Sequence, residues 1–199
     1  MWIIGIDPSL RHTGVCVRNT TDSKAPLYTY EVKTGKLPVI ESASAVADEL
    51  PTFFDSINQY MWPASTVICV ERQIPNAPGS SAAIQFYMYL IVIEVLDNYF
   101  NYMREKFIIT PFPMQLKKYM RVKHGVKEVS RKGSITERFK ELTGLRSSSH
   151  IAESWFMTMM AEDILKQNWT LPMDKSVVKY KIFPKGWKVY GTHSTTISK

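Results

Sequence analysis

The stretch that decides the fold is Met1-Trp-Ile-Ile-Gly-Ile-Asp7-Pro-Ser9, at the start of the chain. Its isoleucines predict a buried strand, and Pro8 ends that strand because it has no backbone donor. A second run, Val67-Ile-Cys-Val-Glu71, is apolar up to its last residue and is typical of a central strand. Both strands therefore end in a carboxylate. A carboxylate in such a place is unfavourable unless a partner compensates its charge.

The rest of the chain alternates short strands with longer helical segments. Two further β-rich runs follow the first strand closely, which predicts an antiparallel meander. The expected strands are 1–7, 13–19, 26–34, 66–71 and 107–110, and the expected helices are 41–60, 80–104, 113–120, 130–143 and 149–167. This order predicts an α/β domain over residues 1–167, with a five-stranded mixed sheet flanked by helices. A basic, aromatic C-terminal extension follows over residues 168–199.

Composition excludes several classes of protein. The chain has 199 residues, of which 45% are hydrophobic and 22% charged, so we expect an ordinary folded domain. No stretch is long and apolar enough to span a membrane, and the chain starts without a basic leader. We therefore expect a cytoplasmic protein with no signal peptide. Cys16 and Cys69 lie in apolar runs, which favours buried free thiols in a reducing compartment.

The charge is distributed unevenly along the chain. Residues 1–100 carry 6 Lys/Arg and 10 Asp/Glu, whereas residues 101–199 carry 19 Lys/Arg and 8 Asp/Glu. The net charge of the two parts is therefore −4 and +11, which together give the +7 of the whole chain. A strongly basic part on a folded domain favours a polyanionic partner, most often nucleic acid. The alternative is a solvated surface with an arbitrary basic bias.

A third motif that contains candidate metal-binding residues is Ser147-Ser-Ser-His150-Ile-Ala-Glu153. The serines predict the N-cap of a helix, and the spacing of three puts His150 and Glu153 on one helical face. If the strands that end at Asp7 and Glu71 are neighbours, their carboxylates meet at one sheet edge, where oxygen ligands suit Mg²⁺ or Mn²⁺. The histidine and glutamate can complete such a metal site. They can also be an ordinary exposed first turn.

Together these motifs resemble the RuvC-type Holliday junction resolvases. The similar segments, in family order, are 3–14, 67–71, Pro111-Phe-Pro-Met-Gln-Leu-Lys117 and Ser149-His-Ile-Ala-Glu153-Ser, and the resemblance spans roughly residues 1–166. It implies an RNase H-like fold, a homodimer and Mg²⁺-dependent cleavage of four-way DNA junctions. Three positions differ from the family. Glu153 stands where the family usually has Asp, and Ser9 stands where Gly is common. Ile74 stands where the family often has an aromatic residue that acts as a wedge at the junction. These features suit a divergent member of phage or viral origin, which would act in the host cytoplasm.

The resemblance also implies a two-metal mechanism of phosphodiester hydrolysis that leaves 5′-phosphate and 3′-hydroxyl nicks. Asp7 would bridge two Mg²⁺ ions, for which Mn²⁺ can substitute. Glu71 would share one ion with Asp7, and His150 and Glu153 would hold the other. A competing role for His150 is to orient the attacking water. We expect DNA phosphates to bind a basic run that consists of Lys117, Lys118, Arg121, Lys123, Lys127, Arg131 and Lys132. Within this run, Lys117 and Lys132 match basic positions of the family best, and for most of the others a solvated helix face is the simpler interpretation.

Two parts of the chain have more open interpretations. Helix 80–104 carries Tyr87, Met88, Tyr89, Ile91 and Tyr99 on several sides, which predicts a dimer interface or, alternatively, a helix buried in its own core. The extension has Tyr180, Phe183, Trp187 and Tyr190 among six lysines, and either binds DNA or packs on the domain.

Two other functions remain alternatives. One is a related RNase H-like nuclease that acts on flaps, forks or RNA–DNA hybrids. The other is a non-catalytic protein that binds branched DNA. An intact set of clustered acids argues against the second, because unused carboxylates would repel the phosphates.

Overall fold

The computed structural model describes residues 1–22, 25–57, 62, 66–73, 80–103, 106–171 and 187–190. The strands are β1 (Trp2–Asp7), β2 (His12–Asn19), β3 (Tyr28–Lys33), β4 (Val67–Val70), β5 (Lys106–Ile109) and β6 (Trp187–Tyr190). The helices are α1 (Val39–Ile57), α2 (Ser80–Tyr99), α3 (Pro113–His124), α4 (Lys132–Thr143) and α5 (Ser149–Leu165). The expected elements are all present, and their order is the expected one.

The strands form one mixed sheet in the order β3-β2-β1-β4-β5-β6. Strands β1, β2 and β3 pair antiparallel, as the short turns between them predict, whereas β1, β4, β5 and β6 are parallel. The predicted α/β fold with a mixed sheet is therefore confirmed. Strand β6, from the extension, adds a sixth strand beside β5.

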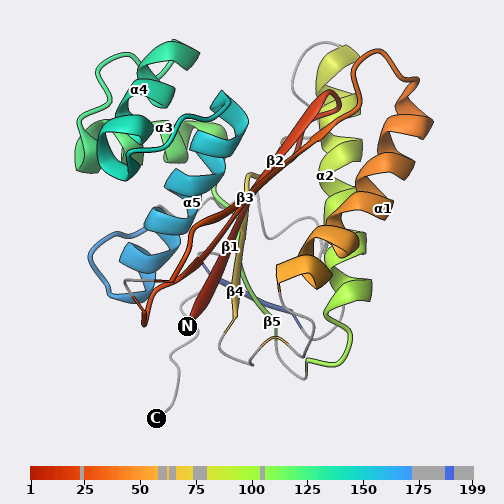
Figure 1. Cartoon of the computed structure of the whole chain (residues 1–199), viewed down its shortest axis with the longest axis horizontal. Coiled ribbons are helices and arrows are strands. Elements are labelled where there is room, and N and C mark those ends of the chain that lie inside the picture. Colours follow the sequence, from red (N-terminus) through yellow and green to blue (C-terminus); the bar gives the residue numbers. More distant parts are fainter. Residues whose placement is uncertain are drawn as a thin grey trace.

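Helices cover both faces of the sheet, α1 and α2 on one and α3, α4 and α5 on the other (Figure 1). Successive residues of a strand point to opposite faces. Accordingly, Ile4 belongs to the hydrophobic core under α1 and α2, whereas Ile3 belongs to the core under the other three helices. Because both faces of the sheet are buried, β1 and β4 are apolar at successive positions of the sequence. None of the described helices is long and apolar enough to cross a lipid bilayer.

Helix α5 lies directly on β1 and β2, because these strands carry glycine where it crosses them. A Cβ atom built at Gly5 would lie 2.1 Å from the carbonyl oxygen of Ser154. One built at Gly14 would lie 2.4 Å from the carbonyl carbon of His150. Atoms cannot approach so closely, so a larger residue at either position would displace the helix. The two glycines therefore fix the first turns of α5 against the end of β1.

Helix α2 packs against α1 and the sheet more fully than its sequence suggests. Met88 and Tyr89 are both completely buried in this chain's own core. For these two residues the prediction of a dimer interface is wrong, and the alternative, burial in the chain's own core, is what the structure has. Tyr87 remains 41% exposed, and the dimer itself stays a prediction.

Candidate metal centre

Two parallel strands bring the first two carboxylates together. Residue Ile6 of β1 is paired with Val70 of β4, so Asp7 and Glu71 occupy the next position on each strand. The backbone N–H of Glu71 donates to the carbonyl oxygen of Ile6 at 3.0 Å, which extends the pairing to this position. Both acids are almost fully buried, with 4% and 8% of their surface exposed. The predicted meeting of two acids at one sheet edge is therefore present.

The first turn of α5 supplies the other two candidate ligands. Its N-cap is Ser148, whose hydroxyl accepts the N–H of Ile151, as the serine run predicts. The ring nitrogen Nδ1 of His150 lies 2.6 Å from Oδ2 of Asp7. One ligand atom each from Asp7, His150 and Glu153 lie within 4.8 Å of one another, which is close enough to hold one ion. The two carboxylates are the oxygen donors that Mg²⁺ and Mn²⁺ prefer, whereas the imidazole is a ligand more typical of transition metals.

The electrostatics of the cluster show that its carboxylates are destabilised as anions. Burial, followed by repulsion from Asp7 and Glu153, raises the pKa of Glu71 well above its ordinary value. Burial and the charge of Asp7 likewise raise the pKa of Glu153 to about 7. The pKa of His150 is raised chiefly by its hydrogen bond to Asp7. Because the carboxylates repel one another, a divalent cation between them would remove the strain that their charges create, and the residues fit such an ion.

A serine that the sequence did not single out holds this arrangement together. The hydroxyl of Ser154 accepts the backbone N–H of Asp7 at 3.2 Å. The same oxygen lies 2.8 Å from the carbonyl oxygen of Gly14 and 2.7 Å from that of His150. One buried side chain thus connects β1, β2 and α5. In the sequence, the only sign of this role is that a small polar residue stands four positions after His150.

A second histidine stands beside the cluster, also unpredicted. The ring of His12 stacks on that of His150, with centroids 5.4 Å apart and planes inclined by 8°. Nδ1 of His12 lies 3.2 Å from a carboxylate oxygen of Glu31 on β3. Glu31 is paired with Gly14, which has no side chain, so its carboxylate can reach diagonally to His12. The pair therefore supports the ring of His150 on the side of β2.

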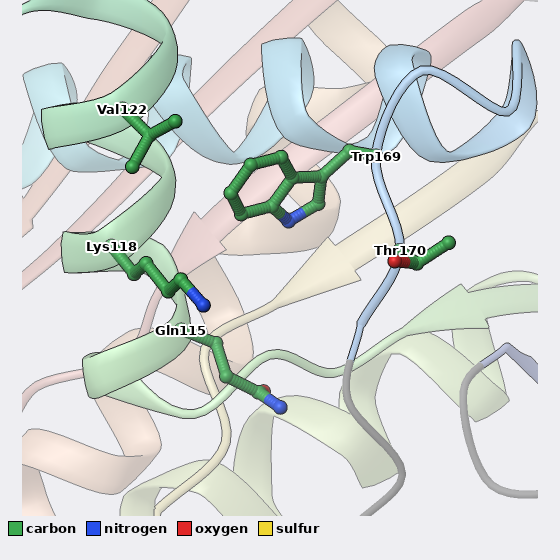
Figure 2. A pocket seen from close by; sticks show the side chains of 5 residues that line it. All are labelled: Gln115, Lys118, Val122, Trp169 and Thr170. Carbon is green, nitrogen blue, oxygen red and sulfur yellow. The ribbon is translucent and has the colours of Figure 1, made fainter.

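The predicted basic residues divide into two groups. Lys117 lowers the pKa of Glu71, and Lys132 acts in the same direction on Glu153, so both lie near the acids. No described contact connects the other expected DNA-binding residues with the acids; they are Lys118, Arg121, Lys123, Lys127 and Arg131. Arg131 is paired with Glu128 at 2.7 Å, and Lys118 lines a separate cavity on α3 (Figure 2). The expected wedge position, Ile74, and the aromatic residues Tyr180 and Phe183 lie outside the described residues.

The sheet order, the helices on both faces and the acidic edge define an RNase H-like α/β domain with a candidate metal centre. Among solved structures, that of Thermus thermophilus RuvC is similar, with a TM-score of 0.57 and 19% identity over 84% of this chain and 97% of that one. The structure of T. thermophilus RuvC in complex with a Holliday junction substrate gives the same TM-score and identity, over 83% of this chain and 96% of that one. No protein-family model matches the sequence, and no curated protein is close enough to count as a relative. The fold is thus RuvC-like, and it is divergent in sequence.

Proposed function

We propose that this protein is a structure-selective endonuclease that resolves four-way DNA junctions by metal-assisted hydrolysis. The observation that carries the proposal is the convergence of Asp7, His150 and Glu153 at one sheet edge. Glu71 is not part of this close group, but it follows the neighbouring strand and interacts electrostatically with Asp7 and Glu153. These residues come from three elements far apart in the sequence, and their mutual repulsion fits a cation. The RuvC-like fold supports the same conclusion, because one of the similar solved structures is that of T. thermophilus RuvC in complex with a Holliday junction substrate.

In this proposal Asp7 would contribute to both ion sites, Glu71 to one of them, and His150 and Glu153 to the other. Two Mg²⁺ ions held there would supply an activated water and would stabilise the leaving 3′ oxygen. His150 must be neutral to act as a ligand. A neutral imidazole can keep its Nδ1–H on Asp7 and would then hold an ion through Nε2.

Lys117 and Lys132 have a different task, which is to hold the DNA. Each lies near an acid of the cluster, so a DNA strand that reached the acids would bring its phosphates close to both ammonium groups. Together they offset the repulsion between the acids and the DNA backbone. The products of this hydrolysis are a 5′ phosphate and a 3′ hydroxyl.

Resolution of a junction needs cuts in two opposed strands, so we propose that the protein acts as a homodimer. A two-fold dimer presents two acidic sites with the symmetry of the junction. Helix α2 supports this role, because Tyr87 is an aromatic side chain that is 41% exposed. Aromatic residues of this kind are enriched in protein interfaces.

A comparison of three DNA substrates tests the proposal. A mobile four-way junction, a flap and an RNA–DNA hybrid are incubated with the protein in Mg²⁺, with Asp7→Asn as the inactive control. We expect symmetrical cuts in the junction, and nicks that DNA ligase can seal. Preferential cleavage of the flap or the hybrid would instead identify a related RNase H-like nuclease. Binding of the junction without any cleavage would identify a non-catalytic binder.

A further inference from the structure

The exposed cations of the acidic N-terminal part of the chain gather beside the candidate metal centre. Residues 1–100 contain six Lys/Arg against ten Asp/Glu. Of these six, Lys24 lies outside the described residues, Arg18 is paired with an acid of α5, and Arg72 is buried. The other three are exposed and form what we call the N-terminal basic group, which consists of Arg11, Lys33 and Lys36. They lie in the turn after β1, at the end of β3 and in the turn that follows β3. All three are therefore at the end of the sheet that holds Asp7 and the start of α5 (Figure 1).

The strand register places Lys33 on the same face of the sheet as the acids. Gly14 is paired with Asp7 in β1 and with Glu31 in β3, and Lys33 lies two residues beyond Glu31. Side chains two apart on a strand share a face, and Val32 points the other way, into the core under α1 and α2. Strands about 4.8 Å apart, with a rise of about 3.3 Å per residue, put the Cα atoms of Asp7 and Lys33 about 12 Å apart. That distance is the length of roughly three to four nucleotides of one strand, counted along the axis of a duplex.

Hydrogen bonds tie the turn after β3 to the turn after β1. The backbone N–H of Thr34 donates to the carbonyl oxygen of Arg11 at 3.2 Å, and Nη1 of Arg11 donates to the carbonyl oxygen of Leu37 at 2.6 Å. The N–H of Leu37 donates to the carbonyl oxygen of Thr34 at 3.1 Å, which closes a β-turn around Gly35 and Lys36. The φ of 59° at Gly35 is one that glycine adopts without strain. Among the described residues, no carboxylate is paired with Arg11 or Lys36. The two cations thus project from a fixed backbone.

The acids near the N-terminal basic group leave it with a surplus of positive charge. The side chain of Glu31 is only 8% exposed and is contacted by His12 at 3.2 Å and by Lys33 at 3.5 Å. The side chain of Lys33 is itself 66% exposed, and an exposed ion pair contributes little, so its ammonium group can turn to a phosphate. Glu41, in the first turn of α1, is the nearest exposed acid along the chain. Three exposed cations beside one exposed acid favour a polyanionic partner.

We propose that the N-terminal basic group binds backbone phosphates of a DNA arm that leaves the acids across β3. The sheet order is β3-β2-β1-β4-β5, so this group lies on the opposite side of the acids from α3, which follows β5. Lys117 of α3 acts on Glu71 from that other side. A strand that lies over the acids therefore meets cations on both sides, and its path runs across the end of the sheet from α3 to β3. The inference rests on the proposed DNA substrate and adds the direction in which that substrate is bound.

Salt dependence of binding separates this group from a general basic surface. The full chain is titrated with a four-way junction in EDTA at several salt concentrations, and the double variant Lys33→Gln/Lys36→Gln is compared with Lys140→Gln/Lys166→Gln. The control loses the same charge from two exposed lysines, one in the last turn of α4 and one after the end of α5. We expect the slope of log affinity against log salt to flatten by about 1.8 for the first variant, at about 0.9 for each lost contact to a duplex phosphate. The control should keep the wild-type slope. Equal slopes for the two double variants would overturn the proposal.

A cross-link locates the arm on the protein. Lys36→Cys and, as the control, Lys140→Cys are labelled with a maleimide photo-crosslinker; the native Cys16 and Cys69 are buried and should not react. We expect the label at position 36 to cross-link to the junction and the label at position 140 to give little product. Equal yields from the two positions would contradict a DNA arm over β3.

A linear duplex of the same sequence separates this inference from the proposed function. Each arm of a junction is a duplex, so the difference in salt slope should appear with both DNAs. A slope difference on both, without any preference for the junction, would support the N-terminal basic group and refute only the proposed junction substrate. A slope difference on neither DNA would overturn the basic group, whatever the protein cleaves.

Discussion

Replacement of Glu153 by glutamine should stabilise the metal-free protein at pH 8, although it removes a residue of the proposed active site. The folded protein keeps a proton on Glu153 up to about pH 7, whereas an ordinary glutamate loses it near pH 4.5. Between these values the folded state binds more protons than the unfolded state, so the free energy of unfolding falls as the pH rises. Glutamine has no proton to lose. The two proteins should therefore be equally stable below pH 4.5 and diverge above it.

The size of this effect follows from the pKa of Glu153. A change from 4.5 to about 7 corresponds to about 3 kcal/mol between the charged and neutral forms. For a chain of this length, each kcal/mol moves the melting temperature by about 2 to 4 °C. In EDTA at pH 8 we therefore expect Glu153→Gln to melt about 6 to 12 °C above the wild type. Mg²⁺ should close the gap, because it stabilises only the protein that binds it.

Thermal unfolding in EDTA at pH 4.5, 6 and 8 provides the measurement. Glu137→Gln is the matched control, because Glu137 is an exposed glutamate of α4 and its replacement should change stability little at any pH. A Glu153→Gln variant that is no more stable than the wild type at pH 8 would refute the explanation that a charge on Glu153 destabilises the folded protein. So would a gain that is the same at all three pH values.

Three further predictions concern activity and assembly. Asp7→Asn should abolish cleavage and leave junction affinity nearly unchanged, because it removes a charged ligand at constant shape; parallel gel-shift and cleavage assays check this, and a wild-type rate in Mg²⁺ would rule out the metal centre. His12→Ala should lower Mg²⁺ affinity and cleavage by roughly tenfold, since supporting residues of metal ligands commonly contribute that much, whereas His12→Phe keeps a stacked ring and should retain most of both. Calorimetry with Mg²⁺ distinguishes the two, and identical values would exclude stacking as the cause. Tyr87→Glu should convert a dimer into monomers by light scattering, with Ile40→Glu on α1 as the exposed control; a monomeric wild type would exclude the dimer.

The parts of the site that the sequence predicted are those with a local signature. Asp7 is marked by the apolar strand before it and the proline after it, and Glu71 by a run of four apolar residues. The serine run marks the cap of α5 and so the position of His150. Each of these signals is contained within a few neighbouring residues, which is why no knowledge of the fold was needed to find them.

The parts that the sequence did not predict depend on how distant segments pair. The contact between His12 and Glu31 exists because Glu31 lies opposite Gly14, and that register is set by the whole meander. The separation of Lys117 from Lys118 depends on how α3 is rotated about its axis. The burial of Met88 depends on α1 and the sheet, whose combined cover of α2 cannot be read from α2 alone.

The position of the four candidate ligands along the chain has a consequence for protein synthesis. Asp7 and His150 are 143 residues apart, so the ribosome adds the second about 7 to 30 s after the first at ordinary rates of elongation. Until α5 has emerged and settled over Gly5 and Gly14, a nascent chain has two of the ligands and no complete site. Under the proposed function, chains that end before α5 should therefore not cleave DNA.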